Sequence, residues 1–227
     1  MIDIHSHMLP AVDDGSKSIE QSLSMLKEAE KQGVTDAILT PHYRADYLPT
    51  REKIEKQFAI LKAAAQDAGI KLSLYLGQEI FAFNDMVNSL KAGKLLSMNA
   101  SKYVLVEFSF KQETDISETV YMLKTHGYIP IVAHLCRYFY ADTEIAREIK
   151  ETGGLIQINA SSVCGSFLHR RKAMNFIKKG LVDFIASDVH FKRKNEMLKA
   201  YDIVSKKFGT DVADKLFTEN AKMILNN

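Results

Sequence analysis

The sequence predicts a parallel α/β barrel. Short, almost continuous apolar segments alternate with segments of helical periodicity along the whole chain, which is the pattern of parallel strands covered by helices. About seven such strands can be counted, enough for a closed or nearly closed barrel. The alternative, an open doubly wound sheet, is less favoured because no glycine-rich phosphate-binding fingerprint follows the first strand.

The predicted strands are apolar and rich in β-branched and aromatic residues, as in the segments YVLVEF and YIPIVA. They occupy residues 2–5, 35–41, 71–76, 103–108, 128–133, 155–158 and 181–186.

Capping residues and glycines mark where the predicted helices begin and end. Ser16 or Ser18 begins the first helix and Thr50 begins the second. We expect helices over residues 16–32, 50–69, 117–126, 143–151 and 170–179, a less regular stretch over 86–96, and two C-terminal helices near 195–206 and 211–225.

The composition is that of an ordinary globular protein, with 227 residues, 46% apolar and 26% charged. A net charge of +2 gives no strong reason to expect nucleic acid or an acidic membrane surface as a partner. We expect a cytoplasmic protein without membrane insertion, since the N-terminus lacks signal-peptide features and no run approaches the roughly 18 apolar residues of a membrane span. The sequence does not indicate the oligomeric state.

Metal-ligand residue types occur at nearly every predicted strand end. His5 and His7 lie two apart at the end of the first strand, so both imidazoles can point to one side. The other strands end near His42, Glu79, Glu107, His134, Asn159, and the pair Asp188 and His190, while Asp14 lies in the first loop. Active sites of parallel α/β folds form at this end of the strands. Because buried unpaired carboxylates and imidazoles are costly, the series predicts a metal site.

The donor set contains nitrogen and oxygen without an obvious thiolate, which suits manganese, iron or zinc better than calcium. Without Asn159 there are nine histidine and carboxylate candidates, counting Asp14, which exceed the shell of one ion, so we expect two or three ions and a bridging carboxylate. A site of this kind in a barrel mouth favours hydrolysis, above all of phosphate esters.

A second phosphatase motif competes with the metal site. Cys164 and Arg170 have the Cys-x5-Arg spacing of cysteine-dependent phosphatases and lie between a strand and a helix. Cys164 follows its strand by several residues, however, and the loop carries Phe167 and Leu168. The metal interpretation is therefore preferred.

Several segments together resemble the polymerase and histidinol phosphatase (PHP) superfamily of metal-dependent phosphoesterases. Within it, the chain is similar to the bacterial protein-tyrosine phosphatases of capsule and exopolysaccharide operons. The matching segments are DIHSHMLPAVDDGSKS, EAEKQGV, LTPHY, GQEI, VEF, IVAHLCRY, LIQINASS, DFIASDVH and FTENAKMIL.

The resemblance implies one domain over residues 1–227, a distorted (β/α)7 TIM-like barrel with three metal ions, usually manganese. It places His5, His7, Glu79 and Asp188 on the first ion, Glu79, Glu107 and His134 on the second, and Asp14, His42 and His190 on the third. Glu79 would bridge the first two.

The phosphate-binding residues match the family less closely. After the fifth strand the family usually has His-Pro-Glu-Arg-Tyr, whereas this chain has HLCRY, which lacks the proline and keeps Arg137. The loop after the seventh strand is shorter than usual and basic. Arg193 is the predicted second phosphate-binding residue, with Lys192 or Lys194 as substitutes.

The resemblance implies hydrolysis of phosphotyrosine by a metal-bound hydroxide, on the tyrosine-rich tail of a partner bacterial tyrosine kinase, in the regulation of capsule or exopolysaccharide synthesis. Arg137 and Arg193 would bind the phosphoryl oxygens. Two alternatives remain open: hydrolysis of histidinol phosphate or another small phosphomonoester, and a catalytically silent, metal-stabilised binding module.

Overall fold

Parallel strands form two sheets in the computed structural model, which describes residues 1–226 apart from the side chains of Leu168 and His169. One sheet has the order β1-β2-β4 and the other the order β3-β5-β6-β7-β8-β9. The strands are β1 (Ile2–Ser6), β2 (Asp36–Leu39), β3 (His42–Tyr43), β4 (Ser73–Leu76), β5 (Glu79–Phe81), β6 (Tyr103–Glu107), β7 (Ile129–Val132), β8 (Leu155–Asn159) and β9 (Phe184–Ala186).

The two sheets continue into each other across short breaks. Only two residues separate β2 from β3, and two separate β4 from β5. The Gly77 amide donates to the Leu39 carbonyl (2.9 Å) and the Glu79 amide donates to the Pro41 carbonyl (3.1 Å), so the pairing spans both breaks. The nine segments therefore follow the seven strand paths that the sequence predicts.

The ring of strands returns to β1 through the segment after β9. Ser6 forms a parallel bridge with Val189, and the His7 amide donates to the Val189 carbonyl (3.0 Å). The predicted α/β barrel is confirmed as a distorted seven-path arrangement, and the open doubly wound alternative is not what the chain adopts.

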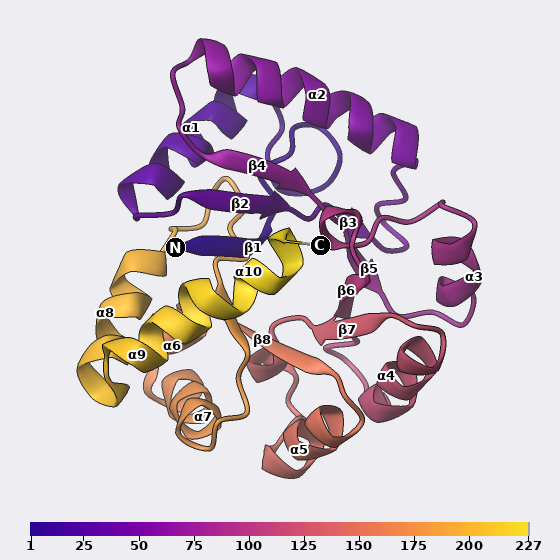
Figure 1. Cartoon of the computed structure of the whole chain (residues 1–227), viewed down its shortest axis with the longest axis vertical. Helices are drawn as coiled ribbons and strands as arrows, with labels where there is room; N and C mark the ends of the chain where they lie inside the picture. Colours follow the sequence, from indigo (N-terminus) through magenta and orange to yellow (C-terminus); the bar gives the residue numbers. More distant parts are fainter. Residues whose placement is uncertain (227) are drawn as a thin grey trace.

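Helices surround the strands, with α1 and α2 outside β2 and β4, and α4 and α5 outside β7 and β8 (Figure 1). The helices are α1 (Ile19–Lys31), α2 (Arg51–Asp67), α3 (Met86–Lys91), α4 (Ile116–Thr125), α5 (Thr143–Glu151), α6 (Ala160–Cys164), α7 (Phe167–Lys178), α8 (Met197–Phe208), α9 (Thr210–Asp214) and α10 (Asn220–Leu225), with short turns η1 (Met98–Ala100), η2 (Leu135–Arg137) and the π-helical η3 (Lys215–Glu219). Of the two candidate caps for α1, Ser18 accepts the hydrogen bond from the Gln21 amide. Among the described residues, no helix combines the length and apolar character needed to cross a membrane.

The C-terminal helix closes one end of the barrel. Figure 1 shows α10 crossing the centre of the strand ring. Ala221 and Ile224 pack with Ile4, Leu105 and Phe184 in a buried apolar cluster. This cluster fills the end at which the strands begin, which leaves the opposite end, where the strands finish, for polar residues.

Several element boundaries differ from the sequence expectation. The second predicted strand, over 35–41, corresponds to β2 alone, and the separate strand β3 follows Pro41, which has no amide hydrogen to donate to a sheet. The less regular stretch over 86–96 contains α3. The helix expected over 170–179 begins earlier, at Phe167, and the last expected helix is three consecutive segments.

Candidate metal centre

All nine residues predicted as metal ligands lie together where the strands finish. His5 is on β1, His42 and Glu79 begin β3 and β5, and Glu107 ends β6. His7, Asp14, His134, Asp188 and His190 are in the loops that follow strands. Eight of the nine are buried, and Asp14 is partly exposed.

Two of these loop residues have unusual backbone conformations. His134 and Asp188 have φ angles of 35° and 50°, in the left-handed region that residues other than glycine rarely occupy. Such conformations persist only where the surrounding structure enforces them, and they cluster at functional sites.

Glu79 is at the centre of the cluster. Its Oε1 atom lies 3.2 Å from His5 Nε2 and 2.9 Å from His134 Nε2, and its Oε2 atom lies 3.3 Å from His7 Nε2 and 2.8 Å from His42 Nδ1. Burial alone would raise the pKa of Glu79, but the surrounding histidines, first His5 and His42, hold it well below its usual value. An ionised carboxylate with imidazoles at both oxygens is placed to bridge two cations.

Asp188 completes one side of the cluster. Its Oδ1 atom lies 3.6 Å from His5 Nε2 and 3.4 Å from His7 Nε2, and those two nitrogens are 3.3 Å apart. Burial acts to raise the pKa of Asp188, but the charges and hydrogen bonds of the histidines lower it. His5, His7, Glu79 and Asp188 thus direct their donor atoms at one point.

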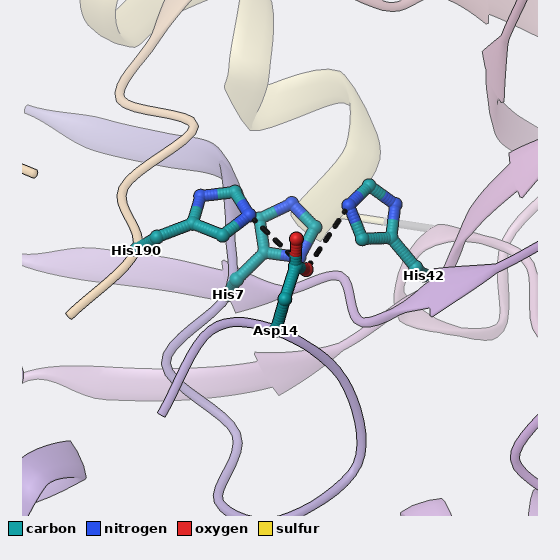
Figure 2. Close-up of side chains that lie close together, drawn as sticks. All are labelled: His7, Asp14, His42 and His190. Atoms are coloured by element: carbon teal, nitrogen blue, oxygen red, sulfur yellow. Dashed lines mark ion pairs between the residues drawn. The ribbon is translucent and has the colours of Figure 1, made fainter. Parts of the chain in front are cut away.

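Asp14 forms a second side with His42 and His190. Figure 2 shows both rings facing the Asp14 carboxylate, with His7 behind it. Asp14 Oδ1 lies 3.5 Å from His42 Nε2 and 3.4 Å from His190 Nε2, and the contact with His190 lowers the pKa of Asp14. The ring of His7 stacks on that of His190 at 4.1 Å between centroids.

Donor atoms within 4.8 Å of one another define three groups among the described residues. These are His7, Asp14, His42 and His190; His5, His7 and Glu79; and His42, Glu79 and Glu107. His134 also lies 3.5 Å from Glu107, as the resemblance implies. The reach of His42 Nδ1 toward Glu79 and Glu107 was not anticipated from the sequence.

The cluster fits divalent cations because it contains buried polar atoms without hydrogen-bond partners. These include Asp14 Oδ1, Glu107 Oε2 and His190 Nε2, and also His42 Nδ1 and Glu79 Oε2, which lie 2.8 Å apart as an ion pair without forming a hydrogen bond. Buried polar atoms normally have partners, since an unsatisfied one is costly. Carboxylate oxygens and imidazole nitrogens directed at shared points are the donors expected for manganese, iron or zinc.

Further polar residues hold the cluster in place, and sequence reasoning did not assign them this role. Asp13 Oδ2 lies 2.7 Å from His7 Nδ1 and accepts the His42 amide (3.0 Å). Gln157 Oε1 lies 3.2 Å from His5 Nδ1 and accepts the His134 amide (2.6 Å). Such contacts orient the imidazoles.

Two other residues shape the site. Asn159 ends its strand as predicted, but it donates to Asp188 Oδ2 (2.7 Å) and belongs to none of the three donor groups. Gly15, next to the Asp13-Asp14 pair, is needed for space, because a Cβ atom there would lie 2.0 Å from the His7 carbonyl oxygen.

Both predicted arginines reach the cluster at Asp188. Arg137 Nη1 lies 3.3 Å and Arg193 Nη1 lies 3.7 Å from Asp188 Oδ2. The two arginines, Asp188 and Lys194 are among the residues that line a pocket of about 280 Å³. The Arg137 guanidinium packs over the Phe110 ring at 4.4 Å. A third arginine, Arg44, also reaches the cluster and was missed.

The cysteine motif does not form an activated thiol. Burial raises the pKa of Cys164 to about 11, so the nucleophilic thiolate is scarce at neutral pH. Its sulfur contacts the Glu196 carbonyl oxygen at 3.9 Å.

Comparison with known proteins places the chain in a family. The family model described as "Capsular polysaccharide synthesis, CpsB/CapC" matches residues 1–226. The chain belongs to the CpsB/CapC family. It is 37% identical over 240 residues to the tyrosine-protein phosphatase CpsB of Streptococcus agalactiae, covering 100% of this chain and 99% of the relative.

Solved structures agree with the CpsB/CapC assignment. The chain superimposes with a TM-score of 0.93 and 31% identity on a structure from work on YwqE of Bacillus subtilis and CpsB of Streptococcus pneumoniae, described as metal-dependent tyrosine phosphatases. The match covers 100% of this chain and 95% of the other. A histidinol phosphate phosphatase from Lactococcus lactis shares the fold alone, at a TM-score of 0.57 and 16% identity, over 91% and 94% of the two chains.

Proposed function

We propose that this chain is a manganese-dependent protein-tyrosine phosphatase formed by one domain over residues 1–227. It acts in the cytoplasm on the phosphorylated tyrosine-rich tail of a bacterial tyrosine kinase and so regulates capsule or exopolysaccharide synthesis. The observation that carries the proposal is the nine-residue cluster at the barrel mouth with Arg137 and Arg193 beside it, in a family whose relatives are named tyrosine-protein phosphatases.

We assign the nine cluster residues to two or three ions. His5, His7, Glu79 and Asp188 would hold the first, Glu79, Glu107 and His134 the second, and Asp14, His42 and His190 the third. The central contacts of Glu79 support its bridging role. Divalent ions bound there would supply Lewis acidity, which makes water nucleophilic at neutral pH and offsets phosphoryl charge.

The protein's own contribution is to bind and orient the phosphoryl group. Arg137 and Arg193 lie at the edge of the cluster, and a guanidinium can donate two parallel hydrogen bonds to phosphoryl oxygens. The Phe110 ring under Arg137 fixes the direction of that fork. The leaving group of phosphotyrosine is a phenolate of pKa about 10, which needs less protonation than an alkoxide.

The exposure of the site favours a phosphotyrosine carried on a protein over histidinol phosphate. The exposed fractions of the Arg137 and Arg193 side chains are 39% and 51%, so the phosphate-binding edge is open to solvent. The basic loop after β9 is short and leaves that edge accessible. A site that encloses a small substrate completely would be expected to have more deeply buried arginines.

The test compares substrates with and without metal. We expect manganese-loaded protein to hydrolyse a phosphotyrosine peptide faster than histidinol phosphate or a phosphoserine peptide, and to lose that activity with a chelator. A Cys164→Ser variant should retain it. The proposal fails if the loaded protein hydrolyses no aryl phosphate, or if activity survives chelation and disappears in the cysteine variant.

A further inference from the structure

Arg44 is the third arginine at the edge of the cluster. It directly follows β3 in the strand path that carries His42. Arg44 Nη2 lies 3.4 Å from Asp14 Oδ2, and Arg44 Nη1 lies 3.9 Å from Glu107 Oε2. The guanidinium groups of Arg137 and Arg193, by contrast, pair with the Asp188 carboxylate, on another side of the cluster.

A tight turn holds Arg44 in place. Its amide donates to the Tyr47 carbonyl (2.9 Å), and the Tyr47 amide donates back to the Arg44 carbonyl (2.7 Å). The guanidinium also lies 5.3 Å from the centre of the Tyr47 ring, and the Tyr47 ring stacks with the His42 ring at 6.3 Å between centroids. The side chain is therefore preorganised beside the cluster by groups that are not themselves metal ligands.

The guanidinium of Arg44 has unused hydrogen-bonding capacity. Arginine offers five N–H donors. The hydrogen bond to Asp14 is long at 3.4 Å, the contact with Glu107 is an ion pair only, and the buried Nε has no partner. The side chain is 26% exposed, so it is neither sealed in the core nor free in solvent. A guanidinium with free N–H donors in this position is suited to bind an anion with several acceptor oxygens.

We infer that Arg44 is a third phosphate-binding arginine, which contacts the phosphoryl group from the side of Asp14 and Glu107 while Arg137 and Arg193 contact it from the side of Asp188. The inference rests on the proposed function. Asp14 and Glu107 would share their negative charge with bound ions, which would leave the spare N–H donors of Arg44 available to the phosphate.

A competing explanation is that Arg44 only neutralises Asp14 and Glu107 and so supports metal binding. The two explanations differ in what a substitution changes. Loss of a phosphate contact weakens binding of phosphate and leaves the metal content intact. Loss of a neutralising charge changes the metal content first.

The experiment uses Arg44→Ala, Arg44→Lys and, as a control, Arg51→Ala, which removes an arginine outside the cluster that pairs with an exposed glutamate on α2 and with a loop carbonyl. Binding of inorganic phosphate to manganese-loaded protein is measured by calorimetry, together with metal content and the KM for a phosphotyrosine peptide. We expect Arg44→Ala to weaken phosphate binding by about tenfold or more, the scale of one charge-assisted hydrogen bond, with unchanged metal content. Arg44→Lys should restore part of the affinity, and Arg51→Ala should match the parent.

The outcomes are distinct. Unchanged phosphate affinity in Arg44→Ala, or a loss that follows a matching loss of metal, overturns the inference. Phosphate binding that depends on Arg44 in a protein without phosphatase activity upholds the inference and overturns the proposed function.

Discussion

At the scale of single residues, the site depends on polar groups that hold the imidazoles as much as on the imidazoles themselves. Asp13 accepts from the backbone amides of His42 and Gly15 while its other contact is the His7 ring. Burial alone would lower the pKa of His7, but Asp13 and the neighbouring carboxylates hold it well above its usual value. Asp13 thus fixes which nitrogen of His7 faces the cluster.

Replacing Asp13 therefore tests this support. We expect Asp13→Asn to lower manganese affinity by about 10- to 100-fold, the usual effect of losing a carboxylate that orients a histidine ligand. Titration of metal-free protein with manganese measures the effect. Asp67→Asn, on the exposed end of α2, is the matched control. Equal affinities in the two variants would contradict the role given to Asp13.

A second residue-scale prediction concerns protons. Burial acts to lower the pKa of His134, but Glu107 and Glu79 raise it to about 9 in the metal-free site. His134 is therefore protonated at pH 7 and must lose its proton before it can bind an ion. Manganese binding at pH 7 should release protons, that of His134 among them, and the share from His134 should disappear as the pH approaches and passes 9. Calorimetry in buffers of different ionisation enthalpy measures this, and binding without proton release at pH 7 would show that His134 does not act as a ligand.

At the scale of elements, α10 is predicted to stabilise the barrel by filling the end opposite the site. Ile224 is fully buried in the cluster of strand residues there. We expect Ile224→Ala to reduce the free energy of unfolding by about 2–5 kcal/mol, the range for deleting a buried isoleucine side chain.

Denaturant unfolding of both Ile224→Ala and a control measures that loss. The control is Ile60→Ala on α2, whose isoleucine is 42% exposed and should cost less than about 1 kcal/mol. Equal unfolding midpoints in the two variants would show that α10 does not support the barrel.

The elements that the sequence predicted correctly are those with strong periodic patterns. The helix over 143–151 has its observed bounds, and the strands ending near Glu107 and at Ala186 are within a few residues of their observed ones. The short strands β3 and β5 were missed, because two or three residues are too few to show a periodic pattern in the sequence. The α10 contact was also beyond prediction, since it depends on tertiary packing.

The candidate site was predicted more completely than the fold boundaries. The carboxyl ends of parallel strands lie at the same end of a barrel. The nine predicted ligands could therefore be expected to lie close together from their positions in the sequence alone. Asp13 and Gln157 were not identified as supports because their role depends on three-dimensional contacts. Arg44 was missed because the sequence does not distinguish an arginine that reaches the site from one that points into solvent.

At the scale of the whole molecule, the fold separates stability from chemistry. The end at which the strands begin is apolar and covered by α10, while the end at which they finish carries buried carboxylates and histidines. In the absence of cations, those carboxylates and the unsatisfied polar atoms are a cost to the folded state. Ions that bind the folded chain better than the unfolded chain should therefore stabilise the whole barrel.

The central claim is that the nine-residue cluster holds the ions that phosphotyrosine hydrolysis requires. The most direct measurement titrates manganese into metal-free protein and follows bound metal and hydrolysis of a phosphotyrosine peptide in the same samples. The account predicts that activity rises with bound manganese and reaches its maximum at two or three ions per chain. Full activity in protein that holds less than one ion per chain would contradict it.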